Sequence, residues 1–188
     1  MAAPGGHVAF SKPHARQKRI DLAQLGESGT IAVLVCEGFA ASDLTLVASA
    51  AERAGYKTSV ISVNKSLVAG RSETNEEMNF VVDGAPGDQD PKAFAGLLIP
   101  GGAPSINKLA TDQDARLMVM DFMRANRPIC VMGEAVAFLG ETAEKDGVSG
   151  EAALALNGEI FAATGETARE DAASTFVKTM DMVDGEAA

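Results

Sequence analysis

The chain has 188 residues, of which 46% are hydrophobic and 22% are charged. That balance is typical of one globular domain and excludes an intrinsically disordered protein, and a domain of this length needs neither a metal nor a disulfide to stay folded. The formal charge of −10 argues against a nucleic-acid-binding protein, because an acidic surface repels phosphates.

The N-terminal segment differs in composition from the rest of the chain. Residues 1–20 contain no acid, but they carry four basic residues and both histidines: Lys12, Arg16, Lys18, Arg19, His7 and His14. The segment lacks the apolar core of a signal peptide, its hydroxyl content is low for a mitochondrial presequence, and nothing in the chain approaches a membrane span. We therefore expect residues 1–28 to be a basic arm, flexible or clasping a partner, residues 29–188 to form a single domain, and the protein to be cytoplasmic.

The domain begins with a predicted strand-helix-strand unit. Thr30–Cys36 is a continuous apolar run, as expected of a strand buried on both faces of a parallel sheet. Ser42–Ala54 has apolar residues at helical spacing, with Ser42 as a candidate N-cap and Gly55 as a candidate C′ residue. Thr58–Val63 reads as the second strand.

Later segments continue the alternation of strands and helices. Residues 64–90 are irregular and predict one or two short strands with loops. The regular elements predicted after them are strands at Phe94–Pro100 and Pro128–Met132 and helices at Asp112–Ala125, Glu134–Leu139 and Ala168–Val183. The alternation predicts a doubly wound, flavodoxin-like α/β domain, a parallel sheet with helices on both faces.

In such a sheet the functional site lies where the strands end at their carboxyl edge. Three stretches fall there: Cys36–Ala41, Pro100–Ala103 and Met132–Ala135. The third resembles a nucleophile elbow, a sharp strand-to-helix turn with one residue exposed at its tip. That residue is Gly133, which suits the backbone angles of the turn but brings no nucleophile.

The candidate pocket therefore consists of backbone amides and carboxylates, at Asp43, Gly101, Gly102, Gly133 and Glu134. Gly101–Gly102 follows a strand without either fingerprint of a nucleotide-binding loop, so we expect a turn or an amide pocket there. Glu134 opens a predicted helix, whose dipole lowers the pKa of its carboxyl and favours capping over general-base catalysis. Binding of a small anion at these amides is a further possibility, which the charge of Glu134 weakens.

The two cysteines are the remaining reactive side chains. Cys36 ends the first strand and is the candidate reactive thiol, although the neighbouring Glu37 favours its neutral form. Cys130 lies inside a predicted buried strand, where a thiol behaves as a small apolar group. A disulfide between them is possible, but we expect both to be reduced. We predict no metal site and no cofactor, because no Cys/His spacing fits a zinc site.

The order of these motifs resembles the ThiJ/PfpI (class I glutamine amidotransferase-like) superfamily. The similar stretches are GFAASDL at 38–44, AGY at 54–56, LLIPGG at 97–102 and RPICVMGEAVAFL at 127–139. In active members the resemblance implies a nucleophilic cysteine at the position of Gly133, a histidine at that of Glu134 and a supporting glutamate at that of Ala40. All three are replaced here, so the resemblance implies a scaffold without its usual chemistry.

Within the superfamily the chain is most similar to the flavodoxin-like C-terminal domain of large-subunit haem catalases. Ser42–Leu44, Pro128–Ile129 and Gly133–Ala135 match that domain's pattern. This closer resemblance implies a role in folding, stability, assembly or protein contact without haem, and a catalase core as partner if the chain is part of a longer protein. The resemblance to the superfamily implies a homodimer or larger homo-oligomer. The alternative is a stress-response enzyme or redox sensor that uses Cys36.

Overall fold

The computed structural model describes residues 29–139, 154–156 and 160–186, so the predictions for the arm at 1–28 lie outside it. The main sheet has the strand order β3-β1-β6-β7-β9-β8. All its neighbours are parallel except β8 and β9, which confirms the predicted doubly wound α/β fold. The strands are β1 (Thr30–Val35), β3 (Lys57–Ser62), β6 (Gly96–Ile99), β7 (Ile129–Met132), β8 (Leu154–Leu156) and β9 (Ile160–Ala163).

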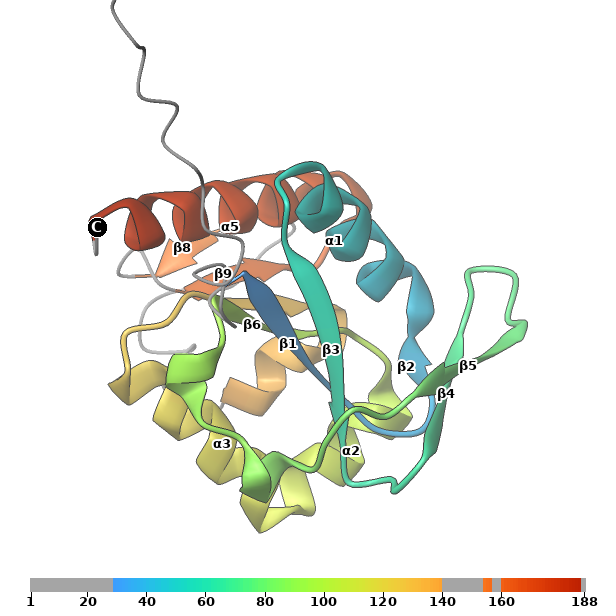
Figure 1. Ribbon diagram of the computed structural model, residues 1–188. Coiled ribbons are helices and arrows are strands. Elements are labelled where there is room, and N and C mark those ends of the chain that lie inside the picture. Colours follow the sequence, from blue (N-terminus) through green and yellow to red (C-terminus); the bar gives the residue numbers. More distant parts are fainter. Residues whose placement is uncertain (1–28, 140–153, 157–159, 187–188) are drawn as a thin grey trace, which may run out of the picture.

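Helices cover both faces of this sheet (Figure 1). Helices α1 (Ala41–Arg53) and α5 (Glu166–Glu186) lie on one face, and α2 (Ala103–Thr111) and α3 (Gln113–Arg124) lie on the other. Alternate residues of β1 enter the two hydrophobic clusters, with Val33 beneath α1 and α5 and Leu34 beneath α2 and α3. Burial on both sides explains why β1 is a continuous apolar run.

A smaller sheet stands beside the main one, with the order β2-β4-β5. It contains β2 (Phe39–Ala40) and an antiparallel hairpin of β4 (Leu67–Arg71) and β5 (Glu77–Val81). Figure 1 shows this hairpin projecting beyond the helices. The prediction of one or two short strands in residues 64–90 is thereby confirmed. The short helical turns η1 (Pro86–Asp88) and η2 (Pro91–Ala93) lead into β6.

One expectation about a helix start is wrong, and one helix was not predicted. Helix α1 is capped at Ala40 without a side-chain hydrogen bond, because β2 runs directly into it, so Ser42 is not the N-cap. Helix α2 is absent from the prediction, in which Gly101–Gly102 form a turn or an amide pocket. Proline is well tolerated in the first turn of a helix, where its missing N–H has no partner to lose. Gly55 does adopt the positive φ, +88°, expected of a C′ residue.

The C-terminal third also differs in part from expectation. The predicted α-helix at Glu134–Leu139 is a 3₁₀ segment, η3 (Gly133–Leu139), and strands β8 and β9 are additional. The last predicted helix is present as α5. In the described part of the chain, no helix is both long and apolar enough to cross a bilayer.

Candidate functional site

The predicted site lies at the carboxyl ends of β1, β6 and β7. The chain leaves β1 for α1 on one face of the sheet and leaves β6 for α2 on the other, so the switch point in strand order falls between these two strands. Hydrogen bonds and close contacts join four of the five predicted pocket residues there, and Gly133 lies against them.

Asp43, in the first turn of α1, is the buried acid of the site. Its side chain is only 1% exposed, and its Oδ2 accepts a hydrogen bond of 2.8 Å from the Gly101 N–H. Burial raises the pKa of the Asp43 carboxyl, while that hydrogen bond and the charge of Arg169 oppose the rise. The fold therefore places an ionisable side chain at this point, at a cost in desolvation that the hydrogen bond and Arg169 only partly offset.

Arg169, from the first turn of α5, is a site residue that the sequence analysis missed. Its Nη1 lies 3.4 Å from Asp43 Oδ1. Asp43 Oδ1 and Arg169 Nε are buried and make no hydrogen bond, so the pair is an electrostatic contact and not a hydrogen-bonded one. A cation in the first turn of a helix opposes the helix dipole. That unfavourable position was the one signal in the sequence that could have identified Arg169.

Glu134 closes the other side of the site. Its Oε2 accepts a hydrogen bond of 2.9 Å from the Gly102 N–H. This bond and one from its own backbone lower the pKa of the Glu134 carboxyl. The predicted direction is confirmed, but the cause is hydrogen bonding at a 3₁₀ turn and not the dipole of an α-helix.

These contacts determine whether the backbone N–H groups of Gly101 and Gly102 are free to bind an anion. Two adjacent backbone N–H groups at a strand end form a natural site for an anion or for a developing oxyanion. Here the Gly101 N–H is bonded to Asp43 and the Gly102 N–H to Glu134. The protein's own carboxylates therefore occupy both donors, and a second anion would meet two like charges.

Gly133 sits at the tip of the elbow, as predicted, with φ of +54°. A Cβ built at this position would lie 3.4 Å from Arg169 Nη2 and 3.6 Å from the Gly101 Cα. A small side chain has room there. The turn thus keeps its geometry while presenting no functional group.

The position that the resemblance assigned to a supporting glutamate, Ala40, contributes backbone only. Its N–H donates to the Gly101 carbonyl at 2.7 Å, and the residue pairs with Arg71 in the small sheet. The carboxylate that reaches the site comes from Asp43, three residues later. The loop after β1 therefore presents only backbone at Ala40 and a carboxylate at Asp43.

Neither cysteine takes part in this site. Cys36 is fully buried beneath α2 and α3, its N–H donates to Ser105 Oγ at 2.8 Å, and burial raises the pKa of its thiol. This burial does not support Cys36 as the candidate reactive thiol. Cys130 is fully buried in the cluster on the opposite face, and burial raises the pKa of its thiol too. Both thiols are free, so the possible disulfide between them is absent.

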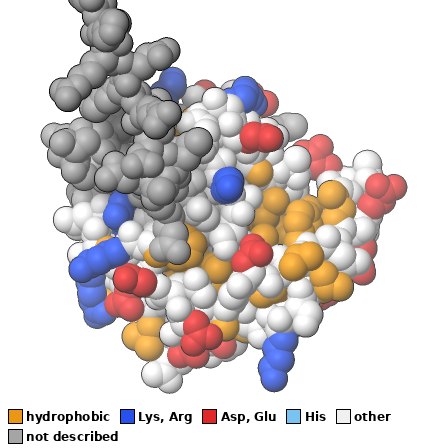
Figure 2. All heavy atoms as spheres, viewed as in Figure 1, with side chains coloured by type: hydrophobic (Ala, Val, Ile, Leu, Met, Phe, Trp, Pro, Cys, Tyr) orange, Lys and Arg blue, Asp and Glu red, His pale blue; other side chains and the backbone are white. Residues whose placement is uncertain are grey.

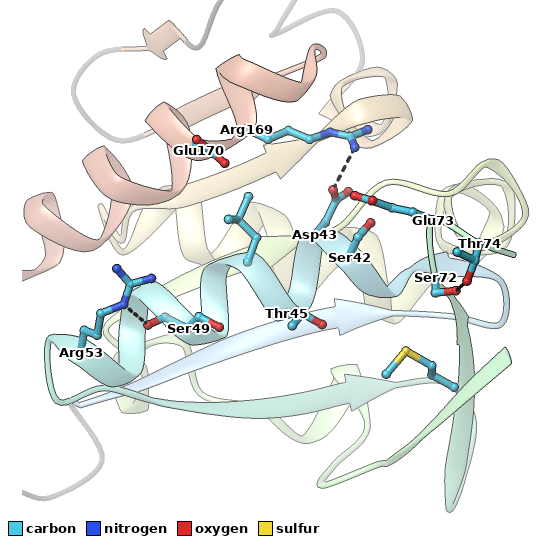
Figure 3. A pocket seen from close by; sticks show the side chains of 12 residues that line it. Ser42, Asp43, Thr45, Ser49, Arg53, Ser72, Glu73, Thr74, Arg169 and Glu170 are labelled. Carbon is cyan, nitrogen blue, oxygen red and sulfur yellow. Dashed lines mark hydrogen bonds and ion pairs between the residues drawn. The ribbon is translucent and has the colours of Figure 1, made fainter. Parts of the chain in front are cut away.

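An open groove of about 650 Å³ runs from this site along α1 (Figure 3). Asp43 and Arg169 lie at one part of its wall, and the hairpin loop at Ser72–Thr74 forms another. Arg53, at the far end of α1, donates to the Ser49 carbonyl at 3.0 Å. Among the described residues no three His, Cys, Asp or Glu side chains are grouped to hold a metal ion. Both histidines lie outside those residues.

Comparison with known protein families identifies the family of this chain. The family model described as "DJ-1/PfpI family" matches residues 29–180. The chain belongs to the DJ-1/PfpI family. This confirms the ThiJ/PfpI resemblance, while the closer resemblance to catalase domains finds no support among these comparisons. No curated protein matches the chain.

Solved structures of the family share the fold of this DJ-1/PfpI chain at low identity. A ThiJ/PfpI domain protein from Brachyspira murdochii superposes with a TM-score of 0.69 at 19% identity, over 84% of this chain and 99% of its own. The C103A mutant of a DJ-1 superfamily protein from Salmonella typhimurium gives 0.65 at 19% identity, over 84% and 96%. A two-domain protein from Anabaena variabilis, with DJ-1/ThiJ/PfpI-like and ferritin-like domains, gives 0.66 at 13% identity, over 83% of this chain and 48% of its own.

Proposed function

We propose that this chain is a DJ-1/PfpI domain without covalent catalysis, which acts through folding, stability, assembly or protein contact. The observation that carries the proposal is that the strand-to-helix turn at Gly133 has neither a nucleophile nor a free backbone donor. Gly133 offers no nucleophile, and the amides that could stabilise an oxyanion are bonded to Asp43 and Glu134. Nucleophilic catalysis of acyl-type transfer needs both an attacking group and free donors for the charge that develops.

A role in assembly is favoured over a thiol-based one by the burial of Cys36. A sensing or catalytic thiol must be partly exposed and rich in thiolate, and the side chain of Cys36 is neither. The Anabaena variabilis protein joins the same fold to a ferritin-like domain, which supports the idea of a domain that works beside another. As the specific form of this proposal, we infer stabilisation of a large haem catalase.

The test of missing catalysis is an assay of the full chain with methylglyoxal and with an unstructured peptide, beside a Cys36→Ala variant. We expect neither protein to exceed the buffer rate. Turnover that disappears in Cys36→Ala would establish the alternative enzyme, and turnover that persists in the variant would equally refute the proposal.

The assembly role has its own experiment. A large-subunit catalase truncated before its C-terminal domain is heated with and without an equimolar amount of this chain, and residual peroxide turnover is measured. We expect the chain to raise the temperature of half-inactivation of the catalase. An unchanged inactivation temperature would refute the catalase role and leave the result of the catalytic assay unaffected.

A further inference from the structure

Helix α3 carries two large apolar side chains on its exposed side. Leu117 and Met120 are each 45% exposed, although other apolar residues of the helix are buried against the sheet. Both line an open groove of about 420 Å³, together with Met123 and with Phe138 from η3. A groove of this volume with mostly apolar walls has the size and lining of a small-molecule site. It shares no lining residue with the Asp43–Glu134 site.

This α3 groove has a polar end and an apolar end. Gln113 and Arg116 line it in the first turn of the helix, and Met120 and Met123 line it in the later turns. Gln113 and Met123 are ten residues apart, which corresponds to about 15 Å along the helix axis. The groove therefore suits a ligand that has one polar head and a long apolar tail.

The charge at the polar end is positive and available. Of the described residues, Arg116 alone brings a charge to the lining of the groove, and it forms no ion pair with another of them. The nearby acids are engaged in other contacts. Asp112 caps the helix, Asp114 lies beside Gly87 of η1, and Asp121 pairs with the arginine three residues later. A ligand head with one negative charge matches this arrangement.

We propose that the α3 groove binds a free long-chain carboxylate. The carboxylate lies against the Arg116 guanidinium and the Gln113 amide, both of which donate hydrogen bonds. The alkyl chain runs over Leu117 and Met120 towards Met123. A chain of about twelve carbons fits this span, because its carbon–carbon bonds are about 1.5 Å long and zigzag. Methionine side chains are flexible and adapt to such a chain.

The charge of the protein favours a small ligand over a large anionic surface. The chain carries 26 acidic and 16 basic residues, and acidic side chains are spread across the face seen in Figure 2. An anionic membrane would meet this net charge and be repelled. A partner protein that placed an acid at Arg116 would also cover Asp112 and Asp114, whereas a single carboxylate contacts only the groove. The inference is independent of whether the domain has catalytic activity.

The test is a titration of the full chain, labelled with ¹³C at its eight methionine methyl groups, with dodecanoate below its micelle concentration. The Met120 and Met123 signals are assigned with leucine variants. We expect both signals to shift with a dissociation constant on the order of 100 μM. Octanoate should bind about tenfold more weakly, since each half-buried methylene contributes roughly twofold. Dodecyltrimethylammonium should leave both signals in place. Unmoved signals with dodecanoate, or equal binding of the cation, would overturn the proposal.

Substitutions locate the ligand in the groove. Arg116→Gln should weaken dodecanoate binding roughly fivefold, and Met120→Glu should weaken it about tenfold or more. The matched controls are Arg124→Gln, on the same helix but outside the groove, and Met78→Glu, at a methionine that is 43% exposed on β5. Both controls should bind dodecanoate as the wild type does, and thermal unfolding checks that all four variants fold. Equal losses in the variants and their controls would show that the ligand binds elsewhere.

Two further measurements distinguish this ligand from other occupants of the groove. Vesicles of equal parts phosphatidylcholine and phosphatidylglycerol should not carry the protein down on centrifugation. Without ligand, Met120→Glu should have the same mass as the wild type by sedimentation equilibrium. Vesicle binding that Met120→Glu abolishes would make the groove a membrane surface, and a changed mass would make it a contact between copies. Either result overturns the proposal.

Discussion

Replacing Arg169 with methionine should destabilise the domain, because it leaves the buried Asp43 carboxylate without its only nearby cation among the described residues. At the observed separation of 3.4 Å, two unit charges interact by about 5 kcal/mol at an effective dielectric constant of about 20 and by about 1 kcal/mol in bulk water. The Arg169 side chain is 28% exposed, so the interaction lies between these limits. We expect Arg169→Met to lower the free energy of unfolding by about 2–3 kcal/mol and the melting temperature by roughly 4–10 °C.

The matched control is Arg124→Met, which removes an arginine of equal charge from a solvated pair with Asp121. Exposed pairs contribute little, so this variant should lose at most about 0.5 kcal/mol. Urea unfolding at pH 7 measures both. As pH falls below about 4, the loss in Arg169→Met should shrink, because the pKa of the Asp43 carboxyl is raised and its protonated form makes no ion pair with Arg169. Equal losses for the two variants at pH 7 would show that the Asp43 contact carries no net stability.

Three further results are expected. The pKa of the Asp43 carboxyl is raised in the folded protein, so just above the unfolded value of about 4 the folded protein keeps a proton that the unfolded chain has lost, and the free energy of unfolding falls as pH rises from about 4. Asp43→Asn should flatten this fall in urea unfolding at pH 4–8, and an unchanged slope would contradict the expectation. Gly101→Ala places a methyl group 3.0 Å from a Glu134 oxygen and should cost about 1–3 kcal/mol, whereas Gly29→Ala, with nothing within 4 Å, should cost almost nothing; similar losses would refute the crowding argument. Cys36 and Cys130 should react with an aromatic disulfide reagent only at the rate of unfolding, so fast modification of the native protein would disprove their burial.

The pattern of hydrophobic residues was sufficient to predict the central strands of the main sheet. The runs that form β1, β6 and β7 are apolar throughout because helices cover both of their faces, and such runs can be recognised as buried strands in a single sequence. Helix α2 was missed because Gly102, which precedes it, and Pro104, in its first turn, are residue types common both in turns and at helix starts. Strands β8 and β9 are short, and β9 is the apolar stretch Ile160–Ala163, which has no periodicity of its own to separate strand from helix.

The candidate site was predictable only as far as its backbone. The strand ends at Gly101 and Gly133 follow from topology, because parallel strands finish at one edge of the sheet. The pairing of each carboxylate with its backbone amide depends on side-chain geometry. The paired residues are 58 and 32 positions apart in the sequence, so local sequence patterns cannot predict these hydrogen bonds. Arg169 joins the site because α5 packs beside α1, a tertiary contact that no local pattern encodes.

The occupied amides at Gly101 and Gly102 have a consequence for how this domain could change over time. A cysteine introduced at Gly133 would be a nucleophile beside donors that are already bound to Asp43 and Glu134. Removing the Glu134 carboxylate alone would free one donor but supply nothing to attack with. Neither substitution alone meets both requirements of nucleophilic catalysis, so covalent catalysis at this elbow would need at least two changes together.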